Sequence, residues 1–108
     1  MSKPPVGEPK ADLHTHLLLA APFATYKKLS GGSLSPPPAR FADFTAFGAY
    51  VGGIVTLLHS IEVGRRVVRD AFAAMIADGV VYAEPVVDLF APHRAGVSWY
   101  EYGAMLAE

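Results

Sequence analysis

Two apolar segments joined by a long amphipathic helix constrain the fold most. Residues 11–19 follow Pro9 and Lys10 as an apolar run, and residues 80–90, "VVYAEPVVDLF", are rich in β-branched side chains. Both segments predict short strands, and the first reads as a strand buried on both faces, as in parallel sheets. Pro85 inside the second segment predicts a bulge there. A strand, a helical connection and a second strand form a βαβ unit, whose strands lie parallel.

The connecting helix is predicted from its ends and from its apolar side. Ser60 can cap the first turn, Glu62 lies where the helix dipole favours a negative charge, and Gly79 supplies the stop. Its apolar stripe consists of Val67, Val68, Ala71, Phe72, Met75 and Ile76. We therefore expect an amphipathic helix that begins after Ser60 and ends before Gly79.

Two shorter helices are expected on either side of this unit. Pro22 opens "PFATYKKL", and the "SGG" at 30–32 closes it, so a brief helix is predicted there. Residues 98–108, "SWYEYGAMLAE", begin with a capping box formed by Ser98 and Glu101. This pattern predicts a second helix.

A stripe of aromatic residues precedes the long helix. Phe41, Phe44, Phe47 and Tyr50 recur every three residues and so share one face of a helical segment, which the glycines at 52 and 53 are expected to break or kink. Core packing is the interpretation that such stripes usually favour. The alternative is a lid over an apolar pocket, in which Phe44 is a candidate substrate-binding residue.

Composition narrows the classes of function. The 108 residues suffice for one modest domain, predicted at 10–108 after a flexible lead-in at 1–9. Nine basic and ten acidic residues give a near-neutral chain without the excess of positive charge that nucleic-acid-binding proteins carry, so we expect no nucleic-acid partner. The most apolar stretch is too short to span a bilayer, so we expect no membrane partner and a cytoplasmic location. Without cysteine, any metal must be bound by His, Asp or Glu.

Two histidines stand one residue apart in the first predicted strand. Side chains two apart on a strand point to the same side, so His14 and His16 project together with Cα atoms about 7 Å apart. Imidazole is a common zinc ligand, and ligands bind at the carboxyl end of parallel strands. The alternative is one core histidine and one solvated histidine. The surrounding leucines make unpartnered imidazoles costly, which favours a shared Zn²⁺ ion.

The quoted segments resemble a known family. "PKADLHTHLLLA" resembles the opening strand of the adenosine deaminase family of amidohydrolases, and "ADGVVYAEPVVDLFAPH" resembles that family's second strand. The resemblance covers residues 9 to 108. It implies the N-terminal portion of a TIM (β/α)8 barrel and zinc-dependent hydrolytic deamination of a purine base or nucleoside. His14 and His16 would be metal ligands, and Leu18 would occupy a substrate-binding position.

The chain also departs from the family pattern. Leu18 and Leu19 stand where the family usually has an acidic residue that recognises substrate, and the family's later ligands (a third histidine, a catalytic glutamate, another histidine and an aspartate) are missing. His93 or Asp88 could approach the same end of the sheet as the histidine pair, but the favoured interpretation is that a loop histidine is solvated rather than a ligand. Glu84 is expected to be a buried partner of a basic residue. The sequence thus predicts an incomplete barrel that carries only the first part of an active site and is inactive alone.

Two other functions are compatible with the sequence. A phosphoesterase of the PHP type also opens with Asp-Leu-His-x-His, although it normally continues with a Ser-Asp-Gly that "LLLAAP" lacks. A partial barrel with bare sheet edges can instead be a non-enzymatic module that associates with itself or with another chain.

Overall fold

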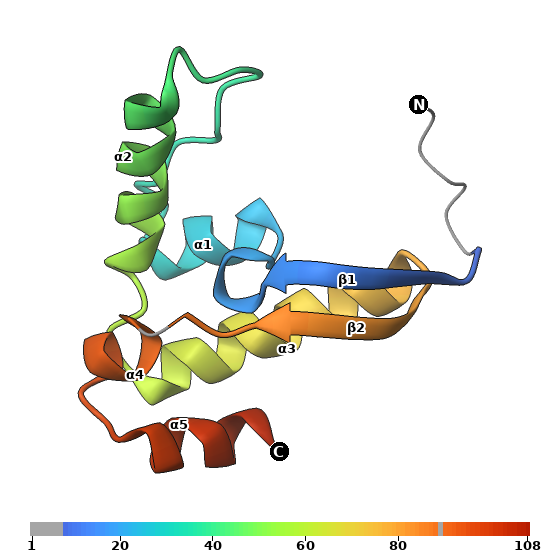
Figure 1. Cartoon of the computed structure of the whole chain (residues 1–108). Coiled ribbons are helices and arrows are strands. Elements are labelled where there is room, and N and C mark those ends of the chain that lie inside the picture. The colour runs from blue at the N-terminus through green and yellow to red at the C-terminus, as the bar shows by residue number, and fades with distance from the viewer. Residues whose placement is uncertain (1–7, 89) are drawn as a thin grey trace.

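Strands β1 (Lys10–His16) and β2 (Val80–Val86) lie side by side and parallel in the computed structural model, which describes residues 8–88 and 90–108 (Figure 1). The other elements in chain order are the 3-10 helix η1 (Leu17–Leu19), α1 (Phe23–Leu29), α2 (Phe44–Val55), α3 (Ile61–Ala77), α4 (Phe90–Ala95) and α5 (Trp99–Leu106). The α/β class and the parallel strand pair are confirmed. The complete barrel stays a prediction, and the lead-in at 1–9 falls mostly outside the described residues.

The strand register contains the irregularity that Pro85 predicts. Asp12 pairs with Ala83 and Thr15 pairs with Pro85, so β1 advances from 12 to 15 while β2 advances only from 83 to 85. Pro85 has no N–H to donate to the ladder, which makes a local break in pairing inexpensive at this point. Regular pairing then ends with His16 beside Val86.

The prediction that β1 is buried on both faces is wrong. Leu13 is 64% exposed and Val81 is 75% exposed, and no residue of the two described strands is fully buried. The strands are exposed because only one face of the sheet is packed. Helix α3 packs against β2, and within the described chain no other layer covers the opposite face. A two-stranded sheet leaves both of its strands as edges.

The hydrophobic core lies at the carboxyl ends of the strands rather than beneath the sheet. The predicted first strand is shorter than expected because β1 ends at His16 and the chain turns into η1, where Ala20 N–H donates to the Leu17 carbonyl at 3.2 Å. This turn places Leu17 and Leu18 among the helices. The core side chains are Leu17, Leu18, Tyr26, Ile54, Leu58, Val67, Val68, Ala71, Ala91, Tyr102 and Met105.

Helix α3 has the ends that its sequence predicts. The Ser60 hydroxyl oxygen accepts a hydrogen bond from Val63 N–H at 3.1 Å, and Gly79 follows the helix with a φ of 87°, a conformation that favours glycine. The apolar stripe is only half covered. Its first part is buried, whereas Ile76 near the end is 72% exposed.

Helix α2 departs from both expectations for the aromatic segment. It continues through the glycines at 52 and 53 without a break. The preferred assignment of the aromatic stripe to the core is wrong, because Phe44 is 83% exposed and Phe47 is 44% exposed. The rings instead form a surface cluster in which the centroids of Phe41 and Phe47 are 5.4 Å apart, and Tyr50 reaches the edge of the core.

Helix α5 follows its capping signal, whereas α4 was not predicted. The Ser98 hydroxyl oxygen accepts from Glu101 N–H at 3.1 Å, which is the serine half of the predicted capping box. In α4, Pro92 sits in the first turn, where a missing N–H costs nothing because that group has no partner inside the helix. A proline in a six-residue helix hides the helical pattern from sequence analysis.

The Tyr26 hydroxyl ties η1 to α1. It donates to the Leu18 carbonyl at 2.8 Å and accepts from Ala21 N–H at 3.2 Å. Burial raises the pKa of Tyr26 to about 12. The folded state therefore holds this proton more tightly than the unfolded state does, and the resulting stability is present below pH 10 and is lost as the pH rises through 12.

We expect the free energy of unfolding to fall by about 2–3 kcal/mol between pH 10 and 12 because of this one phenol. Tyr26→Phe should remove that part of the decline, and at pH 7 it should destabilise the fold by about 1–3 kcal/mol because two backbone groups lose their partner. Urea unfolding at several pH values measures both effects. Tyr100→Phe is the control, since Tyr100 is 92% exposed. An unchanged alkaline slope in Tyr26→Phe would contradict the assignment.

Candidate metal centre

The two histidines lie together at the carboxyl end of β1. Their ring centroids are 5.2 Å apart with an angle of 74° between the ring planes. Both residues are exposed, and the His16 side chain keeps 47% of its accessible surface. The side chain of Asp12, two residues before His14, accepts a hydrogen bond from the backbone N–H of His14 at 3.2 Å. The pair is therefore open to solvent and formed by neighbouring positions of a single strand.

The spacing of the two rings suits one shared ion. Zinc binds imidazole nitrogen at about 2.0–2.1 Å in tetrahedral geometry, which places the centroids of two rings on one ion roughly 5 Å apart. The observed separation of 5.2 Å meets that requirement. Proteins bind zinc mainly through cysteine, histidine, aspartate and glutamate, and this chain has no cysteine. Histidine nitrogens and carboxylate oxygens are therefore its candidate zinc ligands.

Asp88, which lies just after the end of β2, contacts the second histidine, His16. Both of its carboxylate oxygens lie 3.2 Å from His16 Nδ1. The contact follows from the register, because His16 pairs with Val86 and Asp88 comes two residues after that position. With the proton on Nδ1, the imidazole donates to Asp88 and leaves Nε2 as the nitrogen able to bind a metal.

No third ligand among the described residues joins the pair. Over residues 8–88 and 90–108, no three His, Asp or Glu side chains converge on a point where they could hold one ion. Asp88 therefore faces the ring of His16 rather than a common point with both histidines. His59 precedes α3 and His93 lies in α4, and both are exposed. The sequence favours solvated positions for His93 and Asp88 away from the pair, but Asp88 does contact His16.

The remaining sequence candidates occupy three different environments. Leu18 has no exposed surface and belongs to the core, whereas Phe44 projects into solvent from the first turn of α2. Their assignment to substrate binding stays a prediction. The expectation that Glu84 is buried is wrong, because it is exposed. Its Oε1 accepts from the Tyr82 hydroxyl at 3.0 Å, and no basic residue in the described ranges forms an ion pair with it. The bare face of the sheet leaves it in solvent.

Comparison of the chain with protein-family models, with curated proteins and with solved structures found no match. The resemblance to adenosine deaminases therefore stays a prediction from the sequence. In the described part of the chain, none of the helices combines the length and the apolar character needed to cross a bilayer.

Proposed function

We propose that this chain supplies His14 and His16 as the first two ligands of the zinc site of a hydrolytic deaminase that acts on a purine base or nucleoside. The single observation that carries the proposal is the pair of exposed imidazoles, 5.2 Å apart, at the carboxyl end of a parallel strand. Enzymes built on parallel β/α units place their sites at that end. The substrate class follows from the resemblance of the two strand segments to adenosine deaminases.

The residues fit one part of such a site. Two imidazole nitrogens match the donors that zinc prefers, but catalytic zinc sites ordinarily use three protein ligands. The proposal therefore requires at least one more ligand from outside the described residues. When bound, the ion would lower the pKa of its water toward about 7 and so provide hydroxide to attack the carbon that bears the amine.

Asp88 has a positioning role in this proposal. Its carboxylate holds the proton on His16 Nδ1 and fixes the ring orientation, so that the Nε2 lone pair is available to the ion. Carboxylates that orient a metal-binding histidine in this way belong to the outer shell of the site, and they stabilise metal binding without touching the ion.

We expect Asp88→Ala to weaken zinc binding by about 10- to 100-fold. Asp88→Asn should retain most of the affinity, because its amide oxygen can still accept the Nδ1 proton. Isothermal titration of the metal-free protein with Zn²⁺ measures both variants. Glu84→Gln is the matched control, since it removes one negative charge from the neighbouring strand. An Asp88→Asn variant as weak as Asp88→Ala would contradict the positioning role and give the carboxylate a direct bond to zinc.

The function is tested on the protein purified from the cells that produce it, together with any chains that co-purify with it. We expect ammonia to be released from adenine or adenosine, release to stop when zinc is chelated, and release to be absent in His14→Ala. Hydrolysis of a generic phosphate ester without ammonia release would overturn the proposal in favour of a PHP-type phosphoesterase. Absence of both activities in the zinc-loaded protein together with the material that co-purifies with it would overturn the proposal in favour of a non-enzymatic module.

A further inference from the structure

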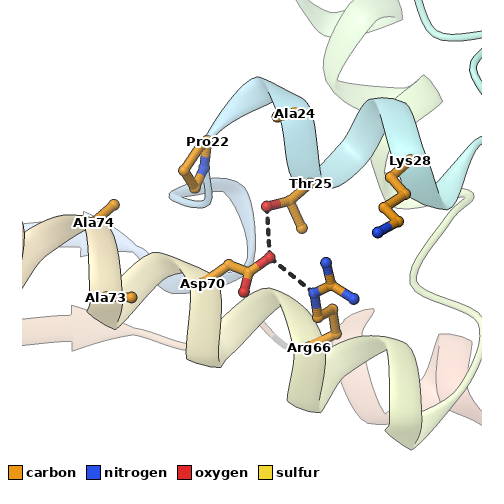
Figure 2. A pocket seen from close by; sticks show the side chains of 8 residues that line it. All are labelled: Pro22, Ala24, Thr25, Lys28, Arg66, Asp70, Ala73 and Ala74. Carbon is orange, nitrogen blue, oxygen red and sulfur yellow. Dashed lines mark hydrogen bonds and ion pairs between the residues drawn. The ribbon is translucent and has the colours of Figure 1, made fainter.

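An open pocket lies between α1 and α3, apart from the histidine pair (Figure 2). Its volume is about 550 Å³, and neither His14 nor His16 lines it. Pro22 and Ala74 form an apolar wall at one end, whereas Lys28 and Arg66 lie at the other (Figure 2). The pocket thus has one apolar end and one cationic end.

The carboxylate in this pocket is already engaged through one of its oxygens. Asp70 Oδ2 accepts from the Thr25 hydroxyl at 2.7 Å and from Arg66 Nε at 3.0 Å. The Thr25 hydrogen bond and then Arg66 hold the pKa of Asp70 below its ordinary value, so the group is ionised at neutral pH. Because the Thr25 hydroxyl donates its single proton to Asp70, it cannot also donate a hydrogen bond to a ligand.

Two cationic groups remain available to an anion. Figure 2 shows the Lys28 amine directed toward the guanidinium of Arg66 across the pocket. Arg66 uses only Nε in its hydrogen bond to Asp70, and no ion pair of Lys28 is found among the described residues. Two cations and one carboxylate leave an excess positive charge at this end. The charge of Lys28 also acts on the Asp70 carboxylate and helps to lower its pKa, so an added oxyanion would share the two cations with Asp70.

We propose that this pocket binds a phosphate-type oxyanion that carries a small apolar group. The oxyanion accepts hydrogen bonds from Lys28 Nζ and from the Nη atoms of Arg66, and the apolar group packs against Pro22 and Ala74. Arginine offers parallel donors that match phosphate oxygens, and lysine adds a point charge. The site does not depend on zinc and stands independently of the deaminase proposal.

The test is a titration of the ¹⁵N-labelled, metal-free protein with inorganic phosphate and with phenyl phosphate at constant ionic strength. We expect saturable shifts of the backbone amides of α1 and α3 around the pocket. Phenyl phosphate should bind roughly tenfold more tightly than inorganic phosphate, because its ring covers the apolar wall. Lys28→Gln and Arg66→Gln should each weaken binding about fivefold, the upper range for partly exposed ion pairs.

Lys27→Gln is the matched control, because Lys27 is an exposed neighbour on the same helix that does not line the pocket. It should bind phenyl phosphate like the unmodified protein. Equal weakening in Lys27→Gln and Lys28→Gln would show a diffuse charge effect and overturn the site. Shifts that never saturate, or equal affinities for the two phosphates, would also overturn the proposal.

Discussion

Replacement of Leu18 by alanine is expected to lower the free energy of unfolding by about 2–5 kcal/mol. Leu18 has no exposed surface, and the other side chains of its core come mostly from five α-helices, so they cannot all close over the space that is left. Proteins of this size have a total stability of about 5–15 kcal/mol, so the variant should lose a large share of it. Urea unfolding followed by circular dichroism measures the change.

Phe44→Ala provides the comparison for Leu18→Ala. Phe44 is 83% exposed, so its removal should alter the free energy of unfolding by no more than about 0.5 kcal/mol. A small effect of Leu18→Ala would contradict the placement of Leu18 in the core. A large effect of Phe44→Ala would place the aromatic cluster of α2 in the core after all.

The second large effect concerns metal binding. We expect His14→Ala and His16→Ala each to weaken zinc binding by more than the roughly 100-fold upper limit for an outer-shell partner, because a direct bond to the ion is lost. Both histidines are exposed, so neither substitution opens a cavity. Equilibrium dialysis followed by elemental analysis measures the bound zinc at each free concentration.

Two further histidines supply internal controls for these variants. His59→Ala and His93→Ala should bind zinc like the unmodified protein, because both residues are exposed and belong to other elements. Equal losses in all four variants would indicate nonspecific binding to surface histidines. Binding that survives in His14→Ala but not in His16→Ala would contradict the shared site and leave a single histidine with Asp88.

Features set by neighbouring residues could be predicted from the sequence. The Ser60 and Ser98 caps depend on a hydroxyl and a backbone N–H three residues away, and both hydrogen bonds are present. Gly79 ends α3 because of its own backbone freedom. The proximity of His14 and His16 follows from the two-residue period of a strand.

Features set by distant elements could not be predicted in the same way. The sequence predicts Leu13 as a buried strand residue. It is exposed because, among the described residues, no layer other than α3 covers the sheet. The contact of Asp88 with His16 joins residues 72 positions apart and depends on the register of β1 against β2, including its bulge. The Lys28 and Arg66 pair depends on how α1 packs on α3, for which the sequence carries no local signal.

The most direct test of the shared zinc site is a two-bond ¹H–¹⁵N spectrum of the histidine rings, recorded while Zn²⁺ is added to the full chain. If one ion bridges the imidazoles of His14 and His16, one nitrogen of each ring will shift, both at the same zinc ratio, and the signals of His59 and His93 will stay unchanged. A response from only one of the two strand histidines, or a uniform response from all four rings, would contradict a shared ion.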